Sequence, residues 1–357
     1  MSNRHVKYLS AKKVKGIKAN YILLIGERSN GKSYCVKSVC IKQAYENKKM
    51  FIYLKRYDLE VKDSLCVAYF ADMPVQELTN NEYTTIDVYR KGIYLANVDP
   101  DTGKAIRGQK IGICHSLSGA EHYKSLQYPD VENVIYEEII SMKGEYLYNE
   151  PDQLQQYISS IFRNNRTGRV YMIGNKLSRM CPYYSKWKLD RVPKQRNDTI
   201  DYYTMKNDNG PDTVLAVYLT QTLNFNTGMF FGKAAENITK GGYETEVQPH
   251  LPKDYKEYTV LHSVVLKHEN VMYLLQLLED PEGYYFWYVQ PKTTPVQDGT
   301  RLISKDFSPN PYHSFRFRGL TDSEDAAFKM LYTGKVCFSD DLTGTEFKSI
   351  LPKYLVV

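Results

Sequence analysis

The chain contains 357 residues, of which 42% are hydrophobic and 25% are charged, and its formal net charge is +6 at pH 7. This length exceeds one typical hydrophobic core, so we expect two domains, and the modest positive charge permits contact with nucleic acid without requiring it. No apolar run approaches membrane-spanning length, the N-terminus lacks a signal core, and the six cysteines show no C-x-x-C or zinc spacing, so we expect a cytosolic protein with reduced thiols and no membrane partner.

The first predicted element is an apolar strand over Tyr21–Ile25, which leads into a complete G-x-x-x-x-G-K-[ST] loop and a helix over Tyr34–Tyr45. The loop consists of Gly26, Glu27, Arg28, Ser29, Asn30, Gly31, Lys32 and Ser33. Its glycines let the backbone wrap closely around phosphates, and the helix N-terminus directs N–H groups at them. Lys32 is expected to reach the β- and γ-phosphates, and the Ser33 hydroxyl to ligate Mg²⁺. The pattern predicts binding of ATP and Mg²⁺, whereas an ordinary glycine turn is the alternative.

The next predicted strand is Met50–Leu54, which ends at Lys55 and Arg56. Further on, Ile86–Val98 and Ala105–His115 flank a turn over 99–103, which suggests an inserted β-hairpin. Apolar strands that alternate with helical stretches indicate an α/β fold with a parallel sheet flanked by helices.

A third buried strand over Val131–Tyr136 runs directly into two acids, Glu137 and Glu138. In P-loop ATPases, a carboxylate at the end of such a strand holds the Mg²⁺ shell. In many nucleic-acid motors, a second carboxylate beside it polarises water. We therefore predict that Glu137 contributes to the metal site and that Glu138 is the general base. The alternative is a strand that ends in two solvated acids.

A helix over Asp152–Phe162 and a strand over Arg169–Ile173 follow, and the strand is followed by Gly174 and Asn175. Asn175 is either a sensor of the γ-phosphate or part of an ordinary turn. Between helix and strand lies a basic cluster that includes Arg163 and Arg166. These arginines could solvate the helix end, contact nucleic acid, or enter a neighbouring subunit's site, where an arginine stabilises the transferring phosphoryl group.

The second half of the chain suggests a different domain. Residues 207–248 are rich in Asn, Gly and Thr and are predicted to be a linker or bridging element, in which Thr213–Leu219 is a possible strand. Strands over Tyr258–Leu266, Val271–Leu278 and Tyr284–Val289 should form an antiparallel meander, followed by a helix over Asp322–Tyr332. We therefore predict an ATPase domain over 1–206, the bridging element, and a smaller α+β domain over 249–357.

Four stretches together resemble one family, in the same order and with similar spacing. They are Leu24–Tyr34, Phe51–Tyr57, Tyr128–Ile140 and Ile161–Arg166. They resemble the DNA encapsidation ATPases of small short-tailed phages (Picovirinae-type), which pump double-stranded DNA into a preformed capsid. The resemblance covers about residues 20 to 190.

The resemblance implies a homo-oligomeric ring, expected to be a pentamer, of additional-strand catalytic-glutamate ATPases. The ring would act in the host cytoplasm, docked transiently on the capsid portal, with a structural packaging RNA as a candidate further partner. Lys32 and Ser33 match the family's phosphate-loop pair, and Glu137 and Glu138 match its paired acids, although the family more often has Asp at the first position. Arg163 matches an arginine that acts in trans.

Several other basic residues match basic positions of the family, and the position matched by Lys124 lies near the subunit interface or the DNA channel. Arg166 is the second candidate for the trans-acting arginine, and Lys124 is a candidate trans or DNA-contacting residue. Arg28 and Arg56 match further basic positions, Arg56 being placed with the same trans or DNA-contacting candidates. DNA contacts of a packaging motor should be mainly to phosphates and hence tolerant of sequence.

In this family the C-terminal domain resembles an RNase H-like nuclease that has lost catalysis. A nuclease of that fold needs an acid in its first strand, and Tyr258–Leu266 contains none. We expect no nuclease activity and instead docking to RNA, portal or DNA. Basic candidates for phosphate contact are Arg301, Lys305, Arg316 and Arg318.

Two other functions remain open from the sequence. A P-loop kinase would use the same loop to phosphorylate a small molecule or protein, with little need for paired glutamates. A nucleotide-gated structural adaptor would bind ATP without significant turnover.

Overall fold

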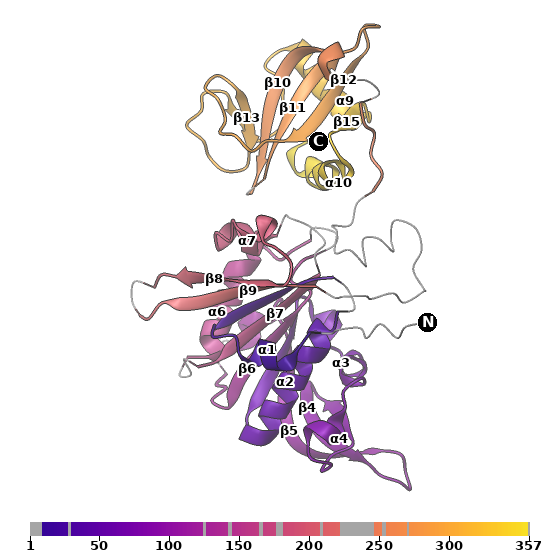
Figure 1. Ribbon diagram of the computed structural model, residues 1–357, viewed down its shortest axis with the longest axis vertical. Coiled ribbons are helices and arrows are strands. Elements are labelled where there is room, and N and C mark those ends of the chain that lie inside the picture. The colour runs from indigo at the N-terminus through magenta and orange to yellow at the C-terminus, as the bar shows by residue number, and fades with distance from the viewer. Residues whose placement is uncertain are drawn as a thin grey trace. The chain divides into compact units, whose positions relative to one another are not determined.

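The computed structural model describes residues 9–27, 30–123, 126–141, 145–163, 167–175, 181–207, 210–221, 246–251, 255–269 and 271–355. The chain divides into two compact units, each with its own sheet (Figure 1). The first unit comprises Met1–Leu177 and Arg191–Gly242, and the second comprises Ser178–Asp190 and Tyr243–Val357. In the described part of the chain, no helix is both long enough and apolar enough to cross a bilayer.

The first unit is built on a nine-stranded sheet with the order β3-β4-β5-β2-β6-β7-β1-β9-β8. Its strands are β1 (Tyr21–Gly26), β2 (Met50–Lys55), β3 (Thr85–Tyr89), β4 (Gly92–Val98), β5 (Ala105–Ser116), β6 (Val131–Glu137), β7 (Arg169–Asn175), β8 (Thr199–Met205) and β9 (Thr213–Thr220). Six neighbouring strands from β5 to β9 run parallel, and antiparallel strands complete both edges. Central strands such as β1 are nearly continuous apolar runs because both faces of a parallel sheet are covered.

Short helices connect these strands. They are α1 (Ala11–Lys15), α2 (Lys32–Asn47), α3 (Asp63–Phe70), α4 (Val75–Leu78), α5 (Ala120–Tyr123) and α6 (Glu150–Ile161), with 3-10 turns η1 (Asp58–Val61) and η2 (Val192–Lys194). Helix α2 packs on the sheet against β5, β2, β6 and β7, and its buried Cys40 and Ile41 belong to the same core as Ile22 and Leu24 of β1. The loop before α2 is thereby held at the carboxyl end of β1.

With one exception, the strand and helix predictions for the first half are confirmed, including the antiparallel hairpin across 99–103. One prediction is wrong: Ile86–Val98 is two strands rather than one. The chain reverses at Arg90 and Lys91, which both have positive φ angles, and β3 then pairs antiparallel with β4. These two residues are not turn types that composition would single out, so the reversal was missed.

The nine-stranded sheet also extends past residue 206, where the sequence placed the end of the ATPase domain. The possible strand within the predicted bridging element is present as β9 (Thr213–Thr220), whose residues Leu215–Thr220 pair parallel with the whole of β1. Flanking Asn and Gly residues indicated turns on either side of this strand, so the sequence did not reveal that it lies inside the sheet between β1 and β8. The first unit therefore includes part of the segment that was predicted to bridge the domains.

The second unit has a six-stranded sheet with the order β14-β13-β10-β11-β12-β15. Its strands are β10 (Thr259–His268), β11 (Val271–Glu279), β12 (Tyr285–Pro291), β13 (Arg301–Ser304), β14 (His313–Ser314) and β15 (Val336–Phe338). Its helices and 3-10 turns are α7 (Pro182–Lys186), η3 (Tyr255–Glu257), α9 (Asp322–Tyr332), α10 (Asp341–Ile350) and η4 (Leu351–Tyr354).

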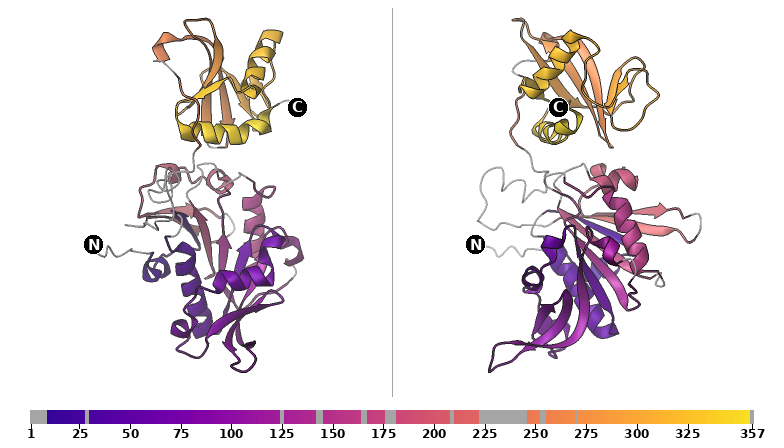
Figure 2. Two further views of the ribbon diagram at one scale, coloured as in Figure 1. Left: turned by 90° about the vertical axis from the view of Figure 1, so that its right-hand side faces the viewer. Right: turned by 180° about the vertical axis from the view of Figure 1, so that it is seen from behind.

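The predicted meander is confirmed, since β10, β11 and β12 pair antiparallel in sequence order (Figure 2). Trp287 and Tyr273 pack with Phe328 of α9 and Phe347 of α10, so both helices cover one face of the sheet. Arg301 is buried and its Nη1 pairs with both carboxylate oxygens of Glu324 at 2.7 and 2.8 Å. The prediction that Arg301 contacts phosphate is therefore wrong, because its guanidinium already has a buried partner.

Candidate active site

The carboxyl ends of β1, β6 and β7 meet because these strands run parallel side by side. In this register Gly26 lies opposite Asn175, and Glu137 lies opposite Ile173. A cavity of about 430 Å³ opens at this edge of the sheet. It is lined by Asn30, Gly31, Lys32, Ser33, Tyr34, Tyr69, Glu137, Glu138, Ile173, Gly174 and Asn175. The structure thus brings the phosphate loop together with the paired acids and Asn175, which follow the loop by more than a hundred residues in the sequence.

Lys32 lies at the base of this cavity and is only 4% exposed. Its ammonium donates hydrogen bonds to the carbonyl oxygens of Gly26 and Glu27, to Asn30 Oδ1 at 3.1 Å and to Asn175 Oδ1 at 3.2 Å. Burial lowers the pKa of Lys32 to about 7, although the charges of Glu137 and Glu27 oppose this shift. Near neutral pH the amine is therefore close to its own titration point.

This pKa predicts that ATP affinity depends on pH. A bound triphosphate favours the charged amine and raises its pKa, so binding above pH 7 takes up a proton. The affinity for ATP should therefore fall as pH rises, by about tenfold between pH 7.5 and 8.5. Titration of a fluorescent ATP analogue checks this, and calorimetry in buffers of different ionisation enthalpy counts the proton. A Lys32→Gln variant should bind weakly with a flat profile, and an equally flat profile in the parent would contradict the prediction.

Thr220, at the end of β9, supports the loop from a position that the sequence did not single out. Asn30 Nδ2 donates to Thr220 Oγ1 at 2.6 Å, and Thr220 Oγ1 donates to the Ile25 carbonyl at 3.2 Å. Asn30 in turn accepts from the Lys32 N–H at 3.3 Å. Gly31 has a φ of +82°, the left-handed region that favours glycine. The loop is therefore held in shape from β9 as well as from β1.

Gly26 is required by this contact with β9. A Cβ atom there would lie 2.2 Å from Thr220 Oγ1 and 2.3 Å from the Thr220 carbonyl oxygen. Because β1 and β9 are paired, neither backbone can move away, and we expect Gly26→Ala to lower the free energy of unfolding by about 1–3 kcal/mol. Urea denaturation checks this, with Gly16→Ala as control, whose nearest neighbour would be at 3.3 Å. Equal stability of the two variants would contradict the prediction.

Glu137 is 7% exposed and lies beside Ser33 and Tyr69. Burial raises the pKa of its carboxyl above the ordinary value, and hydrogen bonds from Tyr69 and Ser33 partly oppose this shift. The Tyr69 hydroxyl of α3 donates to Glu137 Oε1, a contact that the sequence gave no signal for because Tyr69 lies far from any motif. The Ser33 hydroxyl and the Glu137 carboxylate, which are hydrogen-bonded to each other, offer the oxygen ligands that Mg²⁺ prefers.

Glu138 has a different environment, although it is the next residue. Its φ angle is +58°, its side chain is 63% exposed, and its Oε2 pairs with Lys55 Nζ at 3.0 Å. Lys55 also pairs with Glu60 Oε1 at 3.4 Å. The buried Glu137 and the exposed Glu138 thus differ in burial and in partners.

The remaining candidates are placed less uniformly. Arg163 is exposed just after α6, beside a surface depression that it lines with Gln155, Gln156, Ser159 and Ser160, and it does not line the nucleotide cavity of its own chain. Arg56 is buried and bonded to Glu150, so the prediction that it contacts DNA or another subunit is wrong. Arg28, Ser29, Lys124 and Arg166 lie outside the described residues.

Comparison with known proteins identifies the family. The family model described as podovirus DNA encapsidation protein (Gp16) matches residues 6–213, which is more than half of the chain. The chain belongs to this family. The encapsidation family match includes every strand of the nine-stranded sheet up to the start of β9, and it includes the nucleotide cavity.

Individual relatives agree with this assignment. The DNA packaging protein of Bacillus phage B103 is 32% identical over 163 residues, which cover 45% of this chain and 46% of that protein. That of Bacillus phage phi29 is 29% identical over 163 residues, covering 45% and 44%. The matched region therefore spans about half the length of each of these relatives. A subunit of the phi29 viral genome packaging motor assembly has a TM-score of 0.57 at 19% identity, covering 97% of this chain and 99% of that one, which shows a shared fold.

Proposed function

We propose that this chain is an ATP-driven translocase that packages double-stranded DNA into a preformed capsid, as one subunit of a ring on the portal. The observation that carries the proposal is the single cavity that gathers Lys32, Ser33, Glu137 and Glu138 in a member of the encapsidation family. This arrangement supplies phosphate binding, metal ligation and a base, which ATP hydrolysis requires together.

In the proposed mechanism, the triphosphate binds at the N-terminus of α2, where backbone N–H groups and Lys32 contact its phosphates. Asn175 accepts a hydrogen bond from the Lys32 ammonium and would sense the γ-phosphate. Ser33 and Glu137 would hold Mg²⁺, whose charge stabilises the phosphate oxygens. Glu138 would take the proton of the attacking water after its carboxylate leaves Lys55.

We also propose that the second unit is an RNase H-like docking domain without nuclease activity. Its antiparallel meander, with β13 and β14 added in parallel beside β10, supports this fold. β10 contains no acid, and no three His, Cys, Asp or Glu residues cluster as a metal site among the described residues. Lys305, Arg316 and Arg318 are exposed and remain candidates for contact with a structural RNA, the portal or DNA.

The proposed assembly is a pentamer in which Arg163 of one subunit completes the site of its neighbour. Its exposure at the end of α6, away from the cavity of its own chain, supports a role in trans. Hydrolysis would then require ring assembly and would respond to DNA in the channel.

Steady-state ATP hydrolysis with and without double-stranded DNA, over a range of protein concentrations, tests this function. We expect the hydrolysis rate to rise with DNA and with protein concentration, and its stimulation by DNA to be sensitive to salt. The product should be inorganic phosphate. A phosphorylated product with DNA-independent turnover would favour a P-loop kinase. Binding of ATP with negligible turnover under all conditions would favour a structural adaptor.

A further inference from the structure

The backbone leaves the extended conformation immediately after β6, at the residue proposed as the base, and Glu138–Ile139 is called the turn below. Glu138 has a φ of +58°, which is uncommon for a residue with a side chain and persists only where surrounding contacts impose it. The next residue is anchored on one side, since the Ile139 N–H donates to the Ile173 carbonyl at 3.0 Å. The direction of the Glu138 carboxylate depends on how this turn is held.

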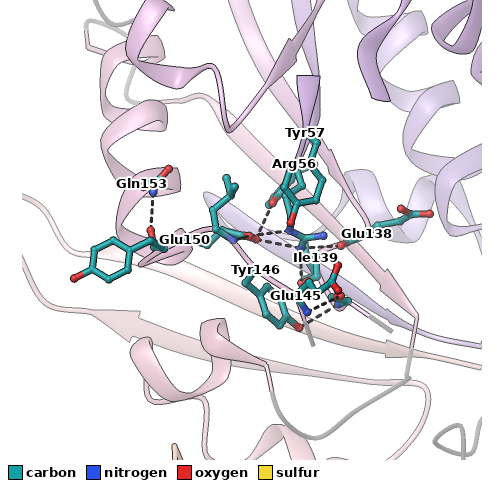
Figure 3. Close-up of polar contacts among 12 residues, drawn as sticks. Arg56, Tyr57, Glu138, Ile139, Glu145, Tyr146, Glu150 and Gln153 are labelled. Atoms are coloured by element: carbon teal, nitrogen blue, oxygen red, sulfur yellow. Dashed lines mark hydrogen bonds and ion pairs between the residues drawn. The ribbon is translucent and has the colours of Figure 1, made fainter. Parts of the chain in front are cut away.

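Arg56 holds the turn from the opposite side. Its Nη2 donates to the Glu138 carbonyl at 3.1 Å and to the Ile139 carbonyl at 3.3 Å. Its Nε and Nη2 also donate to the carboxylate of Glu150 at 2.7 and 3.1 Å. Figure 3 shows the guanidinium between Glu150 and the backbone of the turn, while the Glu138 carboxylate points away from this group.

The Glu150 side chain is itself held in position by groups from three segments. Its side chain is 0% exposed, at the first residue of α6. It accepts the Tyr136 hydroxyl at 2.8 Å and the Leu147 N–H at 2.9 Å in addition to Arg56. The Tyr146 ring covers the guanidinium, with its centroid 5.0 Å from Cζ (Figure 3). Each component of this buried pair therefore has a defined position.

A buried ion pair is a poor way to gain stability, because the loss of hydration offsets most of the attraction. Its advantage is directional: one planar guanidinium bonds two carbonyl oxygens and a carboxylate at fixed angles, which a lysine ammonium cannot reproduce. We propose that the Arg56–Glu150 pair is a positioning device that fixes the turn at Glu138 and so aims its carboxylate at the attacking water. This inference rests on the proposed role of Glu138 as base.

The test compares Arg56→Lys with Arg301→Lys in the full-length protein. Both arginines have side chains that are 8% exposed and both pair with a glutamate, so Arg301→Lys controls for the general effect of weakening a buried pair. We expect Arg56→Lys to lower kcat about 10- to 100-fold, with affinity for a fluorescent ATP analogue changed less than about threefold. Hydrogen exchange of the peptide around 138–141 should become faster. Arg301→Lys should leave kcat and this exchange unchanged.

A second variant covers the case in which Arg56→Lys does not fold. Arg56→Met combined with Glu150→Leu replaces the pair by apolar groups, which proteins often tolerate, and it should lower kcat in the same way. Unchanged kcat and exchange in either folded variant, with Glu138→Gln inactive, would overturn the inference alone. A fall in kcat and affinity together, without faster exchange, would also overturn it. An active Glu138→Gln variant would instead refute the base assignment, and exchange at the turn would still report whether Arg56 holds it.

Discussion

Replacement of Glu138 by glutamine is expected to lower the rate of ATP hydrolysis by about 10²- to 10⁴-fold, the usual contribution of a general base. Glutamine has the same shape but cannot accept the proton of the attacking water. The Glu138 side chain is largely exposed, so its change should shift the free energy of unfolding by less than about 0.5 kcal/mol. ATP binding depends on Lys32 and the loop and should remain within about threefold of the parent.

Glu60→Gln is the matched control, because Glu60 is the other carboxylate paired with Lys55. This substitution removes the negative charge of Glu60 beside Lys55 and leaves Glu138 intact. The Glu60→Gln variant should therefore hydrolyse ATP at the parental rate. Phosphate release and analogue binding are measured for both variants under DNA-stimulated conditions. Comparable rates for Glu138→Gln and the parent would remove Glu138 from the role of base. Equal losses in both variants would point to Lys55 instead.

The features that the sequence predicted well depend on contiguous residues. The strand, glycine loop and helix around Lys32 follow one another in the chain, so local pattern determines both their structure and their position. Glu137 and Glu138 directly follow a buried strand, and parallel strands end at a common edge. That the loop and the acids would share a cavity could therefore be inferred before the sheet order was known.

The features that the sequence missed depend on contacts between distant segments. Thr220 supports Asn30 across 190 residues, because β9 lies beside β1 in a sheet order that no local pattern encodes. Arg56 follows a strand in a basic pair, which is typical of a surface, yet Glu150, 94 residues later, buries it. Composition predicts the average environment of a residue type and cannot identify a partner that only the tertiary fold supplies.

Replacement of Arg163 by alanine is expected to lower hydrolysis by about 10³-fold or more, the usual contribution of an arginine that stabilises the transferring phosphoryl group. The side chain is exposed after α6, so its loss should affect neither folding nor ATP binding by the same chain. Arg196→Ala is the matched control, because it removes an exposed arginine from the same unit and should change the rate less than about twofold. A parental rate for Arg163→Ala would move the assignment to Arg166.

Mixing the two inactive variants separates action in trans from action in cis. In a mixed ring, an Arg163→Ala subunit retains Glu138, and a Glu138→Gln neighbour supplies Arg163 to its site. Random mixing in equal amounts completes about one interface in four, so independent sites should recover about a quarter of the parental rate. If Arg163 served the site of its own chain, no combination would contain both groups and the mixture would stay inactive. Recovered hydrolysis would therefore show both that the subunits associate and that the arginine crosses the interface between them.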